Sequence, residues 1–110
     1  MEKSHKRLEV WQKSIQLTKV VYEVTSKLPA DEKFGLVSQM RRAAVSIPSN
    51  IAEGSARQTN KDALHFFAIA RGSLSELDTQ ENKLQPIQHE IDNVDLLLSE
   101  LIRYRKSKTR

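Results

Sequence analysis

The sequence predicts an all-α protein, folded as a single antiparallel up-down-up-down four-helix bundle over residues 1–110. Apolar residues recur at steps of three and four in four separate segments, which is the spacing of one helix face. The chain holds only 3 glycines and 3 prolines, and no stretch alternates polar and apolar residues as a half-buried strand does. Amphipathic helices joined by short turns pack as a bundle.

Length and composition narrow the class of protein further. A chain of 110 residues can bury roughly two-thirds of its unfolded surface in one core. The absence of cysteine excludes disulfides and thiolate chemistry. We find neither a leader peptide nor an apolar run of about 20 residues. We therefore expect a cytoplasmic protein with no membrane partner.

The first helix, predicted for residues 7–27, has a wide apolar arc. Two stripes lie side by side on it, and the first includes Trp11 and Tyr22 as expected core or interface anchors. A helix in a lone bundle needs a stripe of only about 100°. The surplus predicts a second contact surface, most simply another copy of the same chain. The interface candidates, from the second stripe, are Val10, Leu17, Val21 and Val24.

The second helix is predicted for residues 33–55, with a bend at Pro48. The proline ring presses on the carbonyl of Ala44 and leaves that carbonyl without its helical partner. The side chains expected to satisfy it are those of Ser46, Ser49 and Asn50. The bend either wraps the helix around its neighbours or acts as a hinge, and we favour structural roles for Pro48 and Asn50. Gly54 is expected to end the helix.

The third and fourth helices are predicted for residues 60–84 and 87–106. Thr59 is expected to cap the third helix through its hydroxyl. Gly72 lies inside the apolar stripe of the third helix, at a cost of about 1 kcal/mol relative to alanine. A glycine retained there indicates close approach of a neighbouring backbone. Pro86 is expected to be the first residue of the fourth helix.

Basic side chains concentrate at the C-terminus. All 14 acidic residues precede residue 103, whereas five of the 18 basic residues follow residue 102. This basic tail is either an electrostatic arm for nucleic-acid phosphates or an ordinary solvated terminus. The candidates for phosphate contact in the tail are Arg103, Arg105, Lys106, Lys108 and Arg110.

Three internal arginines form a second basic group. Arg42 and Arg71 lie about equally far from the turn between the second and third helices, so antiparallel packing would place them at similar height. Together with Arg41 they either form a basic belt that binds nucleic acid or make buried or inter-subunit ion pairs. Arginine suits phosphate and carboxylate alike, and we favour ion pairs. The expected acidic partners are Glu53, Glu76 and Asp78.

Residues that would indicate catalysis are not grouped in recognisable motifs. His5, His65 and His89 lie far apart, and no metal-ligand spacing or glycine-rich phosphate loop is present. No serine lies in a nucleophile elbow. We therefore predict that the protein is not an enzyme and uses no cofactor or metal.

Three segments in order point to a family: LEVWQKSIQL, FGLVSQMRRAAVSIPSNIAEGSAR and FFAIARGSLSELDTQ. They resemble the small four-helix-bundle proteins encoded in intervening sequences of bacterial 23S ribosomal RNA genes. The chain is more distantly similar to accessory variability determinant proteins of diversity-generating retroelements, which form pentameric barrels and associate with a reverse transcriptase and nucleic acid. The resemblance implies a bundle fold and a homopentamer, and it leaves RNA, DNA or a reverse transcriptase as possible partners. It brings no activity, because the biochemical role of the family is unsettled.

Two functions follow as hypotheses. The first is a non-enzymatic scaffold or interaction protein that assembles with itself. The alternative is a nucleic-acid-binding accessory module that uses the basic residues named above.

Overall fold

The computed structural model describes residues 8–29, 33–80 and 85–107. Those residues contain four α-helices and no strand, which confirms the all-α prediction. The helices are α1 (Glu9–Thr25), α2 (Ser38–Ser55), α3 (Asn60–Gln80) and α4 (Gln85–Ser107), and a short π-helical turn η3 (Lys33–Val37) leads into α2. The predicted ranges 7–27 and 60–84 extend into residues that lie outside the described part. Within that part, no helix is long and apolar enough to cross a membrane.

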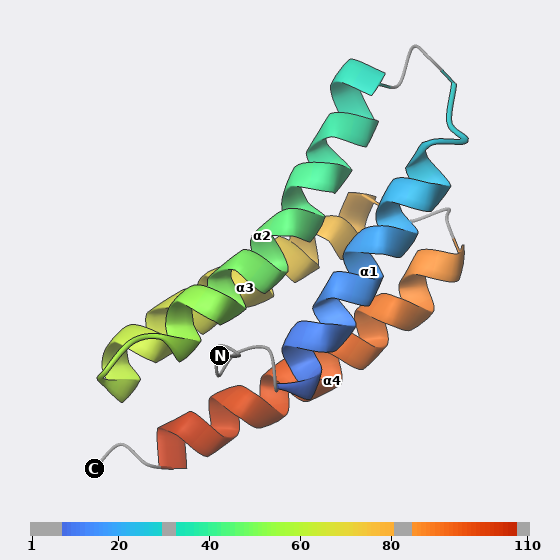
Figure 1. The fold of residues 1–110 in the computed structure, drawn as a ribbon. Helices are drawn as coiled ribbons and strands as arrows, with labels where there is room; N and C mark the ends of the chain where they lie inside the picture. The colour runs from blue at the N-terminus through green and yellow to red at the C-terminus, as the bar shows by residue number, and fades with distance from the viewer. Residues whose placement is uncertain (1–7, 30–32, 81–84, 108–110) are drawn as a thin grey trace, which may run out of the picture.

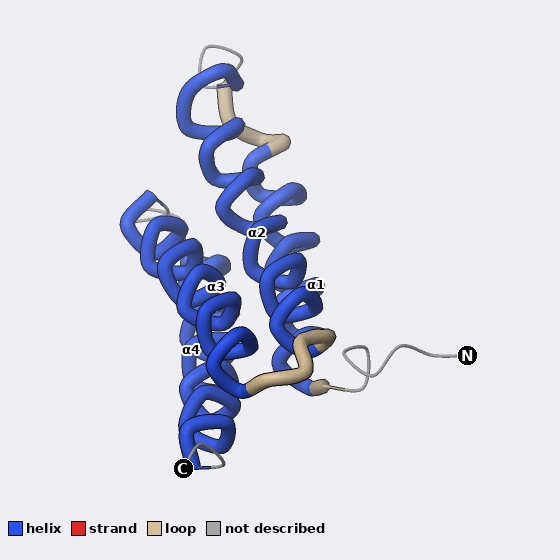
Figure 2. The backbone as a smooth tube through the Cα atoms, turned by 90° about the vertical axis from the view of Figure 1, so that its left-hand side faces the viewer, coloured by secondary structure: helices blue, strands red, loops and turns tan. Residues whose placement is uncertain are grey.

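The helices form an elongated bundle in which each packs mainly against two others. α1 contacts α2 and α4, and α3 contacts the same two helices. Figure 1 shows α2 lying along α3, with α1 and α4 on the other side of the bundle. After a quarter turn, Figure 2 shows the other two packed pairs, α1 beside α2 and α3 beside α4. The principal extents of the molecule are 49 × 30 × 21 Å.

The core forms where the apolar stripes of the four helices meet. The spacing of three and four that defines each stripe is also the spacing of the buried residues, because only one face of each helix turns inward. Fully burying one such side chain contributes about 1.5–3 kcal/mol. Completely buried examples, at 0% exposure, are Leu17, Ile47, Ile51, Phe67 and Leu98.

The wide apolar arc of α1 is used within the chain, which corrects the predicted oligomer interface. α1 packs against both α2 and α4, and these two neighbours bury most of its second stripe, whereas Tyr22 of the first stripe stays 42% exposed. Val10, Leu17 and Val21 are only 0–4% exposed, and Val24 packs partly buried against the core. Side chains that the monomer already buries are not available to a partner. The interface assignment is therefore wrong for Val10, Leu17 and Val21, and it stays a prediction for the partly buried Val24.

Pro48 is buried inside α2. The carbonyl that it leaves without a helical partner, that of Ala44, bonds to α1. The carbonyl of Ala44 accepts a hydrogen bond from Thr18 Oγ1 at 3.2 Å, and that hydroxyl proton is shared with the Ser14 carbonyl at 2.9 Å. The prediction of a local partner from α2 is wrong. Asn50 Nδ2 donates instead to the carbonyl and hydroxyl oxygens of Ser46, at 2.8 and 3.0 Å. The bend at Pro48, and its role as wrap or hinge, stay predictions.

The two helical glycines differ in what surrounds them. α2 ends at Ser55, as the range 33–55 predicted, one residue after Gly54. A Cβ atom at Gly54 would lie 2.6 Å from Phe67 Cε1 and 3.0 Å from the Ala63 carbonyl oxygen. At Gly72 a Cβ would meet nothing within 4 Å. The close approach of a neighbouring helix expected at Gly72 therefore occurs at Gly54.

Two predicted helix starts can be compared with the structure. Thr59 Oγ1 accepts a hydrogen bond from the Asp62 N–H at 3.2 Å, which confirms the cap of α3. α4 begins at Gln85, two residues before the predicted range of 87–106, so Pro86 is its second residue and not its first. Proline is tolerated in a first turn because the N–H groups there have no intrahelical partner.

Candidate interaction surfaces

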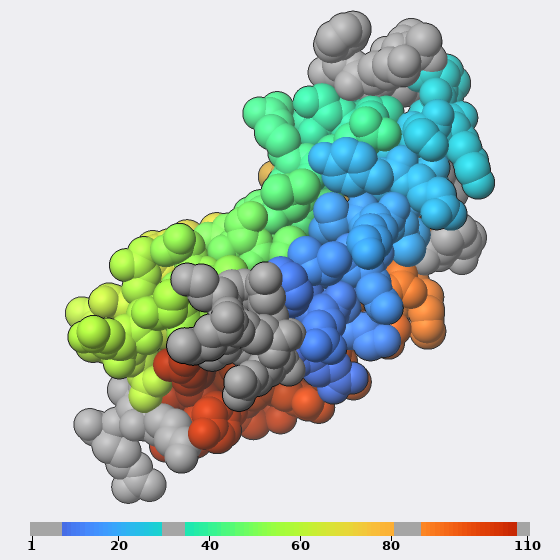
Figure 3. Space-filling view, in the orientation of Figure 1, coloured from blue at the N-terminus to red at the C-terminus, as the bar shows by residue number. Residues whose placement is uncertain are grey.

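An open pocket of about 820 Å³ lies between α1 and the first half of α2. Figure 3 shows the face on which these two helices meet, α1 in blue and α2 in green. The apolar part of the lining includes two side chains that are each 42% exposed, Tyr22 and Val45. Val37 adds a buried apolar surface, and Arg41 and Arg42 supply positive charge. We call this site the α1–α2 pocket.

Arg41 is held in place by α1. Its Nε donates to Thr25 Oγ1 at 3.0 Å, and its Nη2 donates to the Tyr22 carbonyl at 3.3 Å. The Tyr22 ring centroid lies 4.5 Å from the guanidinium carbon, so the cation also stacks on an aromatic face. The Thr25 hydroxyl in turn donates to the Val21 carbonyl at 2.6 Å, which leaves its oxygen free to accept from Arg41. Arg41 thus joins α1 to α2 without any carboxylate.

The predicted ion pairs of the internal arginines do not form among the described residues. The one ion pair found there joins Arg57 to Glu53 at 2.6 Å, so Glu53 pairs with an arginine four residues along the chain, just past the end of α2. Arg42 is exposed. It lines a second pocket together with Glu76, but no ion pair joins the two side chains. Arg71 Nη2 donates to Ser99 Oγ of α4 at 2.7 Å. The prediction of ion pairs within the chain is therefore wrong for these arginines, and the prediction of inter-subunit ion pairs stays a prediction.

The expectation that Arg42 and Arg71 lie at similar height is wrong, because the register of α2 against α3 offsets them, and the basic belt stays a prediction. Ser46 Oγ lies 2.8 Å from Ser73 Oγ, which places these two residues opposite each other. Arg71 lies two residues from Ser73 toward the α2–α3 turn, whereas Arg42 lies four residues from Ser46 away from it. The offset of six residues is about 9 Å along the helices. The side chain of Arg71 in addition bonds to α4.

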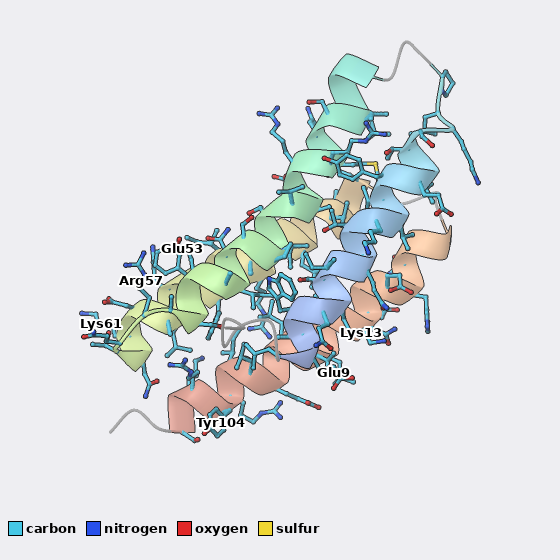
Figure 4. The ribbon with its side chains drawn as sticks, in the orientation of Figure 1. Glu9, Lys13, Glu53, Arg57, Lys61 and Tyr104 are labelled. Atoms are coloured by element: carbon cyan, nitrogen blue, oxygen red, sulfur yellow. The ribbon has the colours of Figure 1, made fainter. Side chains whose placement is uncertain are left out.

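Basic residues from two distant segments meet at one end of the bundle. Figure 4 shows Arg57 and Lys61 beside the α2–α3 turn, toward the end at which α4 finishes. Arg103 and Lys106 of α4 are exposed there. We call Arg57, Lys61, Arg103 and Lys106 the basic end. Sequence reasoning missed its first two members, although the predicted antiparallel bundle would bring its second turn to the end of its fourth helix.

Arg105 ties the two segments of the basic end together. Its Nη1 donates to Asn60 Oδ1 at 2.8 Å, and its guanidinium carbon lies 5.8 Å from the centroid of the Phe67 ring. Arg105 is therefore a structural residue, although the sequence placed it among the phosphate contacts. Lys108 and Arg110, the last two candidates of the tail, lie outside the described residues.

The described residues show no arrangement typical of a catalytic centre. No group of three or more His, Cys, Asp or Glu side chains among them could hold a metal ion. The His65 ring packs edge-on against the Phe66 ring. His89 Nε2 lies 3.5 Å from Asn93 Nδ2 of the same helix. Several hydroxyls donate to carbonyls of their own helix, among them Ser14, Ser49 and Thr79. His5 lies outside the described residues.

Comparison with known families gives one match. A family model described as 23S rRNA-intervening sequence protein matches residues 6–104. This match confirms the resemblance carried by the three segments quoted above and extends it through the fourth helix. Comparison with curated proteins finds no similar sequence. The distant likeness to retroelement accessory proteins stays a prediction.

Proposed function

This chain belongs to the 23S rRNA-intervening sequence protein family, and on that basis we propose that it is a non-enzymatic scaffold that assembles with copies of itself. The family match accounts for the four-helix fold, and assembly is the function that the exposed surface supports best. The hydroxyl groups that donate to their own helices support a non-catalytic role. A cytoplasmic location stays a prediction.

The observation that carries this proposal is the α1–α2 pocket. Monomeric proteins usually leave large apolar side chains scattered singly on their surfaces. Here Tyr22 and Val45, from adjacent helices, are both 42% exposed and line one open pocket of about 820 Å³. Such a site, with arginine at its margin, has the composition of a protein contact surface. It replaces the buried stripe of α1 as the expected interface.

Measuring the mass in solution tests the proposal directly. The mass of one chain is 12.6 kDa, and we expect a multiple of it in sedimentation velocity or light scattering at micromolar concentration. Five copies is the number implied by the resemblance to the retroelement proteins, and we propose it here. A single 12.6 kDa species at every concentration would refute self-assembly.

Nucleic-acid binding is a second candidate function, favoured by the basic end. Arg57, Lys61, Arg103 and Lys106 come from two segments and gather where Arg105 joins α4 to α3. Several such ends in an oligomer would add avidity to contacts that are individually weak. A reverse transcriptase is a further possible partner, on the resemblance alone.

A titration with structured RNA and duplex DNA at two salt concentrations tests the second candidate. Binding through phosphates should weaken steeply as salt rises. Lys61→Glu and Arg103→Glu should each weaken it, whereas Lys19→Glu, an exposed change on α1, is the matched control. Equal losses in all three variants would mean that net charge, and not the basic end, determines binding.

A further inference from the structure

α4 carries an exposed apolar side chain between two acidic ones. Leu96 is 61% exposed, more than any other large apolar side chain in the described part of the chain. Asp92 and Glu100 lie four residues before and after it, and both are exposed. Residues four apart are neighbours on one helix face. We call Asp92, Leu96 and Glu100 the α4 ridge.

The α4 ridge makes no side-chain hydrogen bond or ion pair to another helix among the described residues. The buried side chains of α4 nearest to it, Val94 and Leu98, each lie two residues from Leu96 and so point about 160° away from it around the helix. The hydrogen bond found for Asp92 comes from Gln88 of the same helix, at 2.9 Å. Glu100 makes no hydrogen bond or ion pair to another described residue. The ridge is therefore available to a partner.

The α1–α2 pocket has the complementary chemistry. Val37 and Val45 give it an apolar wall for a leucine side chain. Arg42 makes no ion pair within the described part of the chain, and Arg41 uses only its Nε and Nη2 groups in bonds to α1. A guanidinium has five N–H donors, so Arg41 keeps some for a carboxylate.

The two surfaces also carry their charges in a similar arrangement. Asp92 and Glu100 lie eight residues apart, which is about 12 Å along α4. Arg41 and Arg42 are consecutive on α2, so their side chains diverge by about 100° around that helix and reach different parts of the pocket lining. Two separated cations with an apolar wall match two separated carboxylates with an apolar side chain between them.

We propose that the α4 ridge of one copy docks in the α1–α2 pocket of a second copy. Leu96 packs against Val45 and its neighbours, and the two carboxylates of the ridge meet the two arginines. This inference rests on the proposed self-assembly and names the surfaces that perform it. The two surfaces are different patches, so each copy offers one pocket and one ridge. Contacts of this heterologous kind close into a ring or continue as a filament.

Three matched variants test the docking, each replacing an exposed apolar side chain with glutamine. Leu96→Gln removes the ridge, Val45→Gln removes part of the pocket wall, and Ile69→Gln is the control. Ile69 is 40% exposed on α3 and belongs to neither surface. Glutamine is a good helix former, and all three side chains are at least 40% exposed, so the variants should fold. Circular dichroism melting checks this.

Sedimentation velocity should show that the wild type and Ile69→Gln assemble alike. Leu96→Gln and Val45→Gln should each weaken assembly about tenfold or more, because a buried amide without a partner replaces an apolar contact. A mixture of these two variants still contains one intact pocket and one intact ridge. Labelled Val45→Gln should therefore bind unlabelled Leu96→Gln saturably, but it should not bind unlabelled Val45→Gln. Binding between the two different variants should weaken as the salt concentration rises.

Each other outcome contradicts a specific part of the reasoning. A monomeric wild type would refute the proposed assembly and the docking with it. A wild type that assembles, together with a Leu96→Gln variant that assembles equally well, would refute the docking alone. If Val45→Gln alone weakened assembly, the interface would consist of two pockets facing each other, and the docking of ridge in pocket would be refuted. Two weakened variants that fail to bind in the mixture would likewise exclude pairing of pocket with ridge.

Discussion

Replacing Gly54 with alanine should destabilise the protein, although alanine is the better helix former. Inside a helix the exchange alone would gain about 1 kcal/mol. The new methyl group would lie 2.6 Å from Phe67 Cε1 and 3.0 Å from the Ala63 carbonyl oxygen. Phe67 and Ala63 are both 0% exposed, so neither can move aside without disturbing the core.

The size of the effect follows from these two opposing terms. Overpacking a well-packed core costs about 1–3 kcal/mol, and the contact at Gly54 belongs at the upper end because it involves both a buried ring and a backbone atom. Subtracting the helix term leaves a net loss of about 2 kcal/mol. For a domain of this size that is a fall of roughly 8 °C in melting temperature.

Thermal melting of a matched pair of variants provides the assay. Gly72→Ala makes the same chemical change in α3, where a Cβ meets nothing within 4 Å. It should raise the melting temperature by about 4 °C, since only the helix term applies. In a Phe67→Leu background, Gly54→Ala should cost less because the ring edge is gone. If Gly54→Ala melted at or above the wild-type temperature, the close-packing argument would be wrong.

Two further predictions concern contacts between helices. Thr18→Val should cost about 1–3 kcal/mol by removing the donor to the carbonyl that Pro48 leaves without its helical partner. In a Pro48→Ala background the same change should cost less, because a backbone N–H is restored, and denaturant melts of the four proteins check this. Arg105→Gln should lower the melting temperature, because Arg105 bonds Asn60 across the bundle. Arg103→Gln, an exposed change two residues away, should leave it within about 2 °C of the wild type.

The four helices could be predicted from the sequence because each carries its apolar stripe locally. The spacing through Met40, Ala44, Ile47 and Ile51 indicates a helix whatever lies opposite, and all four residues are buried. The cap at Thr59 was predictable for the same reason, since the partner N–H is only three residues away.

The sites could not be predicted as well, because they depend on what lies opposite. A wide arc on α1 looks the same whether a second copy or a second helix of the same chain covers it. Gly54 and Gly72 differ only in their neighbours from another helix. The register of α2 against α3 separates Arg42 from Arg71, and equal distances from a turn did not reveal it. Val45 and Leu96 became visible as surface residues only when the core had been assigned.

The hydrogen bond from Thr18 to the Ala44 carbonyl has a consequence for the way the bundle opens. In an uninterrupted helix that carbonyl would be satisfied inside its own segment, and α2 could fray or unwind by itself. Because Pro48 has no N–H group, the Ala44 carbonyl accepts its hydrogen bond from Thr18 on α1 instead. Local opening of α2 around Pro48 therefore also exposes a polar contact of α1. We expect native-state hydrogen exchange to show the amides of α1 and α2 around this contact opening together, as one cooperative unit.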